Sequence, residues 1–401
     1  MIVLANDGLA QEGIKIFKDR GIDVATEKRD LKRLIEEIPG IDALLVRSAT
    51  KVTREIIEAG ARGNIKIIGR AGVGYDNVDV EAASEHGIVV KYAPYGNTNS
   101  TAELALGLMI AVSRNIPQAH SVLKNGVWSK RKYEGVELSG KTLGIIGCGR
   151  IGQRLSQLAI GFDMDVIGYD KMVEDVRARF PDSRIKYHPE DYVLKKADYV
   201  SIHASGKDVI IGEKELRMMK STAYLVNTSR GGCVDETALY GALNIEGYIA
   251  GAGLDVFVDE PKKEGQTFEN RFRNLDNVIM TSHLGASTKE AQIKTSIEIA
   301  TVVAGYLIGE EKLIWANAVN AGEEISTETK PVYTLFVYHQ DVPGMFAKID
   351  DALGRYGVNI REISARRLND NSQAVYLLTT KPNENAIREI GKIEGVKRVT
   401  L

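Results

Sequence analysis

Three polar side chains that could share one reaction, Arg230, Glu260 and His283, each follow a predicted strand in the second half of the chain. A guanidinium is always charged and binds carboxylates with two parallel hydrogen bonds, and an imidazole exchanges protons near neutral pH. The three strands are predicted over residues 224–227, 253–257 and 278–281. Because ligands of α/β proteins gather at the carboxyl ends of the strands, we expect the three side chains to meet there.

Each of these residues, taken singly, has an ordinary structural explanation. Arg230 could form a surface ion pair or begin a helix, Glu260 could be a turn carboxylate beside Pro261, and His283 could be a structural histidine. Their places on successive strand ends, in a chain that also carries a dinucleotide motif, favour a shared site. His120 and the other histidines outside strand ends have no comparable setting.

The dinucleotide motif is the run G-C-G-R-I-G at residues 147–152, which follows a predicted strand and opens a helical pattern. In that context Gly147 permits the tight turn, Gly149 lets a pyrophosphate approach the backbone, and Gly152 allows the helix to pack closely on the strand. Asp170 ends the next predicted strand. Its carboxylate would accept hydrogen bonds from the ribose hydroxyls and repel a 2′-phosphate, so the sequence predicts NAD as the cofactor. The alternative is a glycine turn in an unrelated α/β protein.

A second glycine-dense segment, residues 69–74, lies in the first half of the chain. The residues that follow it, Tyr75 and Asp76, break the dinucleotide pattern. The segment is typical of a loop after a strand whose exposed amides can hold an anion. We therefore expect the second half of the chain to bind the dinucleotide and the first half to present the substrate.

The composition excludes several classes of protein. A chain of 401 residues is expected to form two or three domains. Its net charge of −2 gives no field that would attract nucleic acid or an anionic membrane. Two cysteines without ligand spacing predict neither disulfides nor a metal site. The longest apolar run, residues 104–112, is too short to cross a bilayer, and residues 1–7 do not resemble a signal peptide, so we expect a cytoplasmic protein.

The order of predicted elements indicates an α/β fold. Short apolar runs alternate with helical patterns over the first ninety or so residues and again from about residue 99, which predicts two Rossmann-like, doubly wound parallel sheets. The helical segment 101–114 is apolar nearly all round and must be buried. A polar linker over 320–331 precedes a βαββαβ pattern typical of a ferredoxin-like unit.

These segments together resemble the D-isomer-specific 2-hydroxyacid dehydrogenase family over residues 1 to about 320. Residues 47–48, 97–103 and 128–133 also match this pattern, and residues 338–346 with 356–360 resemble an ACT regulatory domain. The resemblance implies a substrate-binding domain of flavodoxin-like fold formed by 1–98 with 285–320, a Rossmann domain that binds NAD over 99–284, and an ACT-like domain over 331–401. The resemblance also implies that the protein assembles as a homodimer or homotetramer.

The resemblance also implies roles for the three strand-end residues. Arg230 would hold the carboxylate and the reacting oxygen of a phosphorylated 2-hydroxy acid. His283 would take the hydroxyl proton as the carbon passes hydride to the nicotinamide, and would return it in the reverse direction. Glu260 would hydrogen-bond His283, fix its tautomer and stabilise the imidazolium.

Further binding residues are implied in the same way. The cofactor would be bound by Gly147, Gly149, Arg150, Ile151, Gly152, Asp170, His203, Thr228 and Asp255. The substrate would be bound by Arg47, Ser48, Val73, Gly74 and Asn97. An L-serine effector would contact His339, Asp341 and Asn359, although Asp341 stands where an asparagine is usual. The basic run 130–132 is either a phosphate contact or a solvated surface.

The sequence departs from the family in two places and leaves the activity open. The loop after His203 lacks a proline and is short, which bears on NAD affinity, and Ser282 replaces the proline that usually precedes the histidine. The candidate functions are a dehydrogenase that acts on a phosphorylated 2-hydroxy acid, another D-2-hydroxyacid dehydrogenase, a glyoxylate or hydroxypyruvate reductase, and a non-enzymatic NAD(H) sensor. The ACT-like tail and Arg47 favour the dehydrogenase that acts on a phosphorylated acid.

Overall fold

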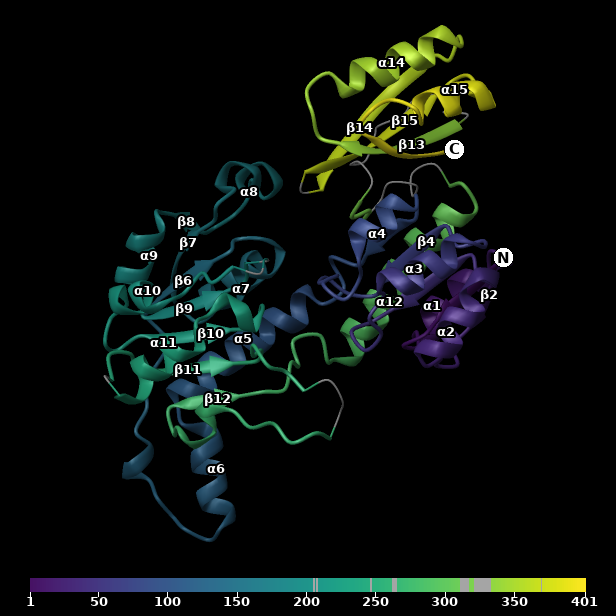
Figure 1. The fold of residues 1–401 in the computed structure, drawn as a ribbon. Helices are drawn as coiled ribbons and strands as arrows, with labels where there is room; N and C mark the ends of the chain where they lie inside the picture. Colours follow the sequence, from purple (N-terminus) through teal and green to yellow (C-terminus); the bar gives the residue numbers. More distant parts are fainter. Residues whose placement is uncertain are drawn as a thin grey trace. The chain divides into compact units, whose positions relative to one another are not determined.

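A computed structural model describes the whole chain except residues 205, 207, 246, 262–264, 311–316, 321–332 and 369. The chain forms two compact units, one of residues 1–96 with 292–401 and one of residues 97–291 (Figure 1). They contain two parallel sheets and a C-terminal antiparallel sheet, which confirms the predicted fold class. No helix among the described residues is both long and apolar enough to cross a bilayer.

The first unit contains a five-stranded parallel sheet in the order β2-β1-β3-β4-β5. Its strands are β1 (Ile2–Ala5), β2 (Asp23–Ala25), β3 (Ala43–Val46), β4 (Ile67–Arg70) and β5 (Val89–Tyr92). Its helices are α1 (Gln11–Lys18), α2 (Leu31–Glu37), α3 (Arg54–Ala61), α4 (Val80–Glu85) and most of α12 (Lys289–Leu307). The strand β2 was missed by the sequence analysis because it is short and leaves no residue fully buried.

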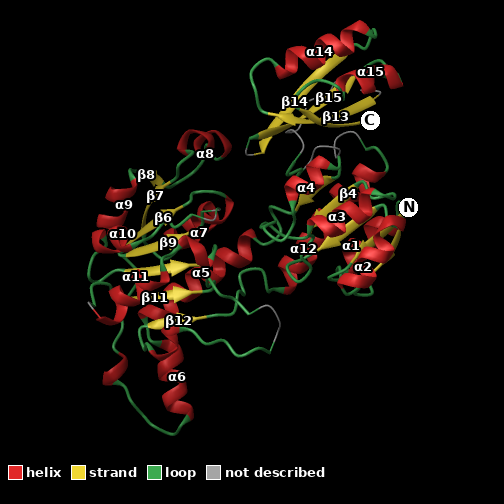
Figure 2. Ribbon diagram, viewed as in Figure 1, coloured by secondary structure: helices red, strands yellow, loops and turns green. Residues whose placement is uncertain are grey.

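The second unit contains a seven-stranded parallel sheet in the order β12-β11-β10-β9-β6-β7-β8. Its strands are β6 (Thr142–Ile146), β7 (Asp165–Tyr169), β8 (Lys186–Tyr187), β9 (Tyr199–Ile202), β10 (Tyr224–Asn227), β11 (Gly251–Leu254) and β12 (Val278–Met280). Its helices are α5 (Thr98–Ser113), α6 (Ile116–Lys124), α7 (Arg150–Ile160), α8 (Val173–Arg179), α9 (Glu190–Lys196), α10 (Glu213–Met218) and α11 (Glu236–Tyr240). Leu225 and Val226, consecutive in β10, enter two different apolar clusters, so helices cover both faces of this sheet (Figure 2).

The prediction of a strand over 253–257 was wrong in its bounds, because β11 begins and ends earlier. Its first residue is Gly251, and a Cβ at Gly253 would lie 2.9 Å from the Cβ of Leu108 in α5. The strand is therefore glycine-rich because α5 packs directly upon it, and it lacks the β-branched residues that mark other strands. The prediction that α5 is largely buried is confirmed.

The C-terminal part of the first unit folds as an antiparallel sheet in the order β14-β15-β13-β16. Its elements are β13 (Tyr333–Gln340), α14 (Met345–Arg355), β14 (Ile360–Leu368), β15 (Asn371–Leu378), α15 (Glu384–Ile390) and β16 (Val396–Thr400). The predicted linker lies outside the described residues apart from Asn320. That residue is not part of a linker: it is fully buried, and its amide group donates to the carbonyl of Ile88 at 2.9 Å and accepts from the amide of Val90 at 2.8 Å.

Candidate active site

The glycine motif forms a turn that no larger residue could make. Gly147 has φ of +91°, and a Cβ there would lie 2.4 Å from the backbone nitrogen of Ala204. A Cβ at Gly152 would lie 2.6 Å from the carbonyl oxygen of Gly147. Gly149 precedes the first residue of α7 and has open space where a Cβ would be. The turn therefore leads tightly into the N-terminus of α7, whose first amides suit the phosphates of a dinucleotide.

Asp170 follows β7 and lies beside this turn. One carboxylate oxygen accepts a hydrogen bond from the amide of Cys148 at 2.7 Å, and the other accepts from the amide of Met172 at 2.9 Å. Both bonds fix the plane of the carboxylate and leave lone pairs for further donors. Cys148, the second residue of the motif, is buried, and burial raises the pKa of its thiol.

Two buried polar atoms at neighbouring strand ends have no hydrogen-bond partner within the described part of the chain. They are Nδ1 of His203, after β9, and Oγ1 of Thr228, after β10. Nε2 of His203 lies 2.8 Å from the hydroxyl of Ser201. Burial lowers the pKa of His203 to about 4, so the ring is neutral near pH 7. Unsatisfied buried polar atoms require an explanation, and together with the glycine turn they fit a polar ligand such as NAD.

Arg230 lies in a turn that a buried asparagine braces. Oδ1 of Asn227 accepts from the backbone nitrogen and hydroxyl of Ser229 at 3.0 and 2.9 Å, and its Nδ2 donates to the carbonyl of Arg230 at 2.9 Å. The arginine side chain is half-buried and donates to the carbonyl of Ser229 at 2.8 Å. A Cβ at Gly231 would lie 2.0 Å from the carbonyl carbon of Phe257. The turn therefore packs directly against the loop that leads to Glu260.

Glu260 and His283 are in direct contact. Oε2 of Glu260 lies 2.8 Å from Nδ1 of His283, and Oε1 accepts from the amide of Phe257 at 3.2 Å. The hydrogen bond that His283 donates to Glu260 raises the pKa of the imidazole above its ordinary value, against the opposing effects of burial and of Arg230. Burial opposes ionisation of Glu260, but the bond and charge of His283, with smaller contributions from Phe257 and Arg230, lower its pKa overall. The pair can therefore hold a proton on the imidazole and keep Nε2 for a reacting group.

Asp255 directly follows β11 and is fully buried. Its Oδ1 accepts from the hydroxyl of Thr281 at 2.6 Å and the amide of Leu284 at 2.7 Å, and its Oδ2 accepts from the amide of Gly285 at 3.0 Å. Both oxygens thus bind the loop that carries His283.

The residues expected to bind substrate are divided between the two units. Arg47 and Ser48 follow β3, and Val73 and Gly74 follow the neighbouring strand β4 in the first unit. The amides of Val73 and Gly74 have no acceptor among the described residues. Asn97 belongs to the second unit, and its buried Oδ1 likewise has no partner in the described part of the chain.

Sequence reasoning missed two residues that shape the loop after β3. Asp7 accepts from the amides of Arg47 and Thr50 at 2.8 and 2.9 Å. Asn77 donates to the carbonyls of the same two residues, both at 2.7 Å. Asp7 stands shortly after β1, so the expectation that polar residues after a strand line the site could have identified it, as it did Arg230. Asn77 does not directly follow a strand, and nothing in the sequence marks it.

The three expected effector residues do not meet within one copy of the C-terminal sheet. His339 pairs with Ser372 at one end of β13, and Asp341 beside it forms an ion pair with Arg367. Asn359 precedes β14 at the opposite end, where its amide donates to the hydroxyl of Thr379 at 3.0 Å. The lysines and arginine at 130–132 lie exposed.

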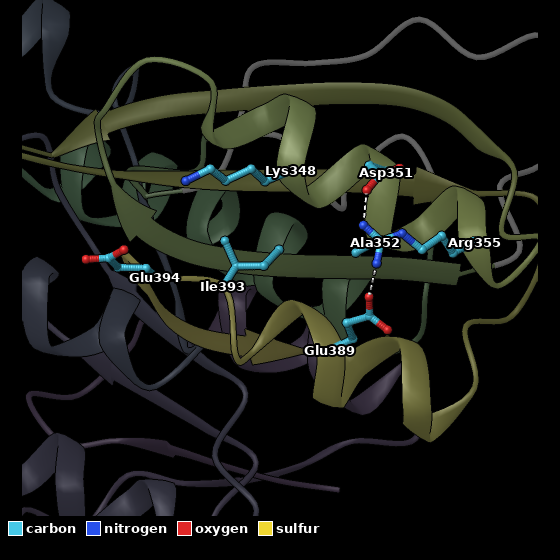
Figure 3. A pocket seen from close by; sticks show the side chains of 7 residues that line it. All are labelled: Lys348, Asp351, Ala352, Arg355, Glu389, Ile393 and Glu394. Carbon is cyan, nitrogen blue, oxygen red and sulfur yellow. Dashed lines mark hydrogen bonds and ion pairs between the residues drawn. The ribbon is translucent and has the colours of Figure 1, made fainter.

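A pocket of about 280 Å³ on the helical side of the same sheet includes none of these residues (Figure 3). It lies between α14 and α15 and is lined by Lys348, Asp351, Ala352, Arg355, Glu389, Ile393 and Glu394. Arg355 forms one ion pair with Asp351 on the same helix and another with Glu389 of α15, so its charge is already matched by two carboxylates.

Comparisons with known proteins identify the family of the chain. Residues 106–285 match the family described as "D-isomer specific 2-hydroxyacid dehydrogenase, NAD binding domain". The chain is 42% identical over 301 residues to the hydroxypyruvate reductase of Thermotoga maritima, and the match covers 74% of this chain and 95% of that protein. It therefore belongs to the D-isomer-specific 2-hydroxyacid dehydrogenase family, as the sequence resemblance predicted, and the glycine turn and Asp170 lie in the family's NAD-binding domain.

A second relative is named for a different activity. The chain is 43% identical over 337 residues to the D-3-phosphoglycerate dehydrogenase of Methanocaldococcus jannaschii, covering 83% of this chain and 62% of that protein. It thus spans less than two thirds of that relative's length. A solved NAD⁺-bound 3-phosphoglycerate dehydrogenase of Entamoeba histolytica is similar with a TM-score of 0.63 and 27% identity, over 77% of this chain and 95% of that chain.

Proposed function

We propose that the chain catalyses the NAD-dependent oxidation of D-3-phosphoglycerate to 3-phosphohydroxypyruvate, the first step of L-serine biosynthesis. The observation that carries this proposal is the Glu260–His283 pair at 2.8 Å, beside the turn of Arg230 that packs on the loop leading to Glu260, in a member of a 2-hydroxyacid dehydrogenase family. The choice of substrate is supported by the relative in Methanocaldococcus jannaschii, which is a D-3-phosphoglycerate dehydrogenase.

In the proposed mechanism, Arg230 binds the carboxylate and the C2 oxygen and so orients the reacting carbon. Neutral His283 accepts the C2 hydroxyl proton at Nε2, because its Nδ1 is engaged by Glu260. The carboxylate of Glu260 then stabilises the imidazolium. Bound NAD supplies the hydride acceptor. In the reverse direction the imidazolium returns the proton to the same oxygen.

The remaining binding roles complete the proposal. We assign Gly147, Gly149, Arg150, Ile151, Gly152, Asp170, His203, Thr228 and Asp255 to the cofactor, and Arg47, Ser48, Val73, Gly74 and Asn97 to the substrate. With a net charge of −2, the chain must meet the charge of a phosphorylated acid through such local groups. Residues 1–98 with 285–320 would form the substrate domain, 99–284 the NAD-binding domain and 331–401 a regulatory domain.

The test is a panel of substrates followed by the absorbance of NADH. D-3-phosphoglycerate, D-glycerate and 2-hydroxyglutarate are each supplied with NAD, and hydroxypyruvate and glyoxylate with NADH, with and without L-serine. The highest kcat/KM for D-3-phosphoglycerate supports the proposal. A preference for hydroxypyruvate would instead support the activity of the Thermotoga maritima relative. Tight NADH binding without turnover of any of these compounds would support an NAD(H) sensor.

The choice between NAD and NADP is expected to depend on Asp170. Asp170→Ala removes a charged acceptor from beside the glycine turn, so KM for NAD should rise about 10- to 100-fold while the preference over NADP narrows. Steady-state kinetics with both cofactors measure this. Asp175→Ala, on the exposed face of α8, is the control and should leave both KM values unchanged. An unaltered NAD:NADP ratio in Asp170→Ala would remove Asp170 from the ribose site.

The pH dependence of oxidation should report the Glu260–His283 pair. Only neutral His283 accepts a proton, so kcat/KM rises with pH with its midpoint at the pKa of His283. Because Glu260 raises that pKa, the midpoint should lie above 6.5, and Glu260→Gln should move it to lower pH. The plateau should fall as well, because the imidazolium loses its carboxylate. A midpoint that stays in place in Glu260→Gln would contradict the pairing.

A further inference from the structure

The backbone of His283 is held in an unusual conformation. Its φ is +57°, in the left-handed region that residues with a side chain rarely occupy. Such a conformation persists when the surrounding structure fixes it from several directions. The residues that fix it therefore decide where the imidazole lies, including its 2.8 Å contact with Glu260.

One side of the loop is held by Asp255. The carbonyl oxygen of Asp255 accepts from the amide of His283 itself at 2.8 Å. Its carboxylate accepts from the amides of the next two residues, Leu284 and Gly285, at 2.7 and 3.0 Å. Three successive amides of the loop thus point toward one buried residue.

The other side of the loop is held by two hydroxyl groups in the first turn of α5. Ser100 and Thr101 both donate to the carbonyl oxygen of Gly285, at 2.8 and 3.0 Å. Both residues are buried, with 8% and 3% of their surface exposed. A Cβ at Gly285 would lie 3.3 Å from Thr101 and 3.4 Å from Asp255, so the peptide is enclosed between them.

We propose that Ser100 and Thr101 are positioning residues for His283. Their hydroxyls fix the carbonyl of Gly285 while Asp255 fixes the preceding amides, and together they keep His283 in the left-handed conformation that places Nδ1 on Glu260. This inference rests on the proposed role of His283 in proton transfer.

The double variant Ser100→Ala/Thr101→Val removes both hydroxyls with little change in shape. The loop should then hold His283 less firmly and the contact with Glu260 should loosen. In the full chain without substrate or cofactor, the imidazole titration of His283 followed by NMR should move to lower pH, toward the ordinary value. The chain has six histidines, so comparison with His283→Asn assigns the signal. We expect kcat to fall about 10- to 100-fold with a smaller change in KM, because a small misplacement of a catalytic group has an effect of this size.

Ser113→Ala is the matched control. It lies near the other end of α5, is buried, and loses a hydroxyl contact of 2.7 Å with Tyr199, so it should reduce stability without moving the His283 titration. Thr101→Ser keeps the hydroxyl and should retain the wild-type midpoint and kcat. An unchanged His283 titration in the double variant would overturn the proposal, as would an equal shift in Ser113→Ala. Should the double variant not fold, Ser100→Ala alone should give a smaller shift in the same direction, and no shift there would also overturn it. Because the titration needs no substrate, it decides the positioning role even where the panel disproves the proposed reaction.

Discussion

His283→Asn is expected to lower kcat by about 10²- to 10⁴-fold, the contribution typical of a positioned acid–base group, while NADH still binds. Asparagine is the suitable replacement because it tolerates the left-handed backbone that position 283 requires, with φ of +57°. The variant therefore removes the imidazole while leaving the loop in place. The measurements are kcat with D-3-phosphoglycerate and NAD, and the Kd of NADH by fluorescence titration.

The control for this variant is His120→Asn, which changes an exposed histidine on α6 and should leave kcat unchanged. The loss in His283→Asn should also be the same in both reaction directions, because one group carries the proton each way. A variant that kept more than a tenth of wild-type kcat would show that another group transfers the proton.

The main features of the site could be predicted because they depend on local sequence. A residue at the end of a parallel strand is placed at one edge of the sheet whatever the rest of the chain does, and this rule singled out Arg230, Glu260 and His283. The glycine motif is local as well, since Gly147 and Gly152 lie within one strand–turn–helix unit. Such patterns are read from a few neighbouring residues.

The supporting contacts could not be predicted because they join distant segments. Ser100 and Gly285 are 185 positions apart, and nothing in either segment alone indicates that they bond. Strand register is equally hidden: only the pairing of β13, β14 and β15 shows that Asn359 lies at the opposite end of the sheet from His339. The shift of β11 has the same origin, because its glycines are explained by the helix that packs on them.

Arg230→Gln is expected to lower kcat/KM for the 2-hydroxy acid by about 30- to 5000-fold. Loss of one partner of a hydrogen-bonded charge pair costs about 2–5 kcal/mol, and each 1.36 kcal/mol is tenfold in rate. Arg230→Lys keeps the charge but cannot bind a carboxylate bidentately, so its loss should be intermediate. The glutamine variant should also move the pH midpoint of oxidation upward, because Arg230 opposes protonation of His283. That direction is opposite to the one expected for Glu260→Gln.

The opposite pH shifts of Arg230→Gln and Glu260→Gln distinguish the roles of Arg230 and Glu260 better than the losses in rate do. A general loosening of the site would reduce activity in both variants and move both midpoints in the same direction, toward the ordinary value of 6.5. Arg177→Gln changes an exposed arginine of α8 that pairs with Glu174 at 2.9 Å, and it should alter neither kcat/KM nor the midpoint. If Arg230→Gln kept kcat/KM within threefold of wild type, Arg230 would not bind the substrate carboxylate. If the variant moved the midpoint downward, Arg230 would not act on the charge of His283.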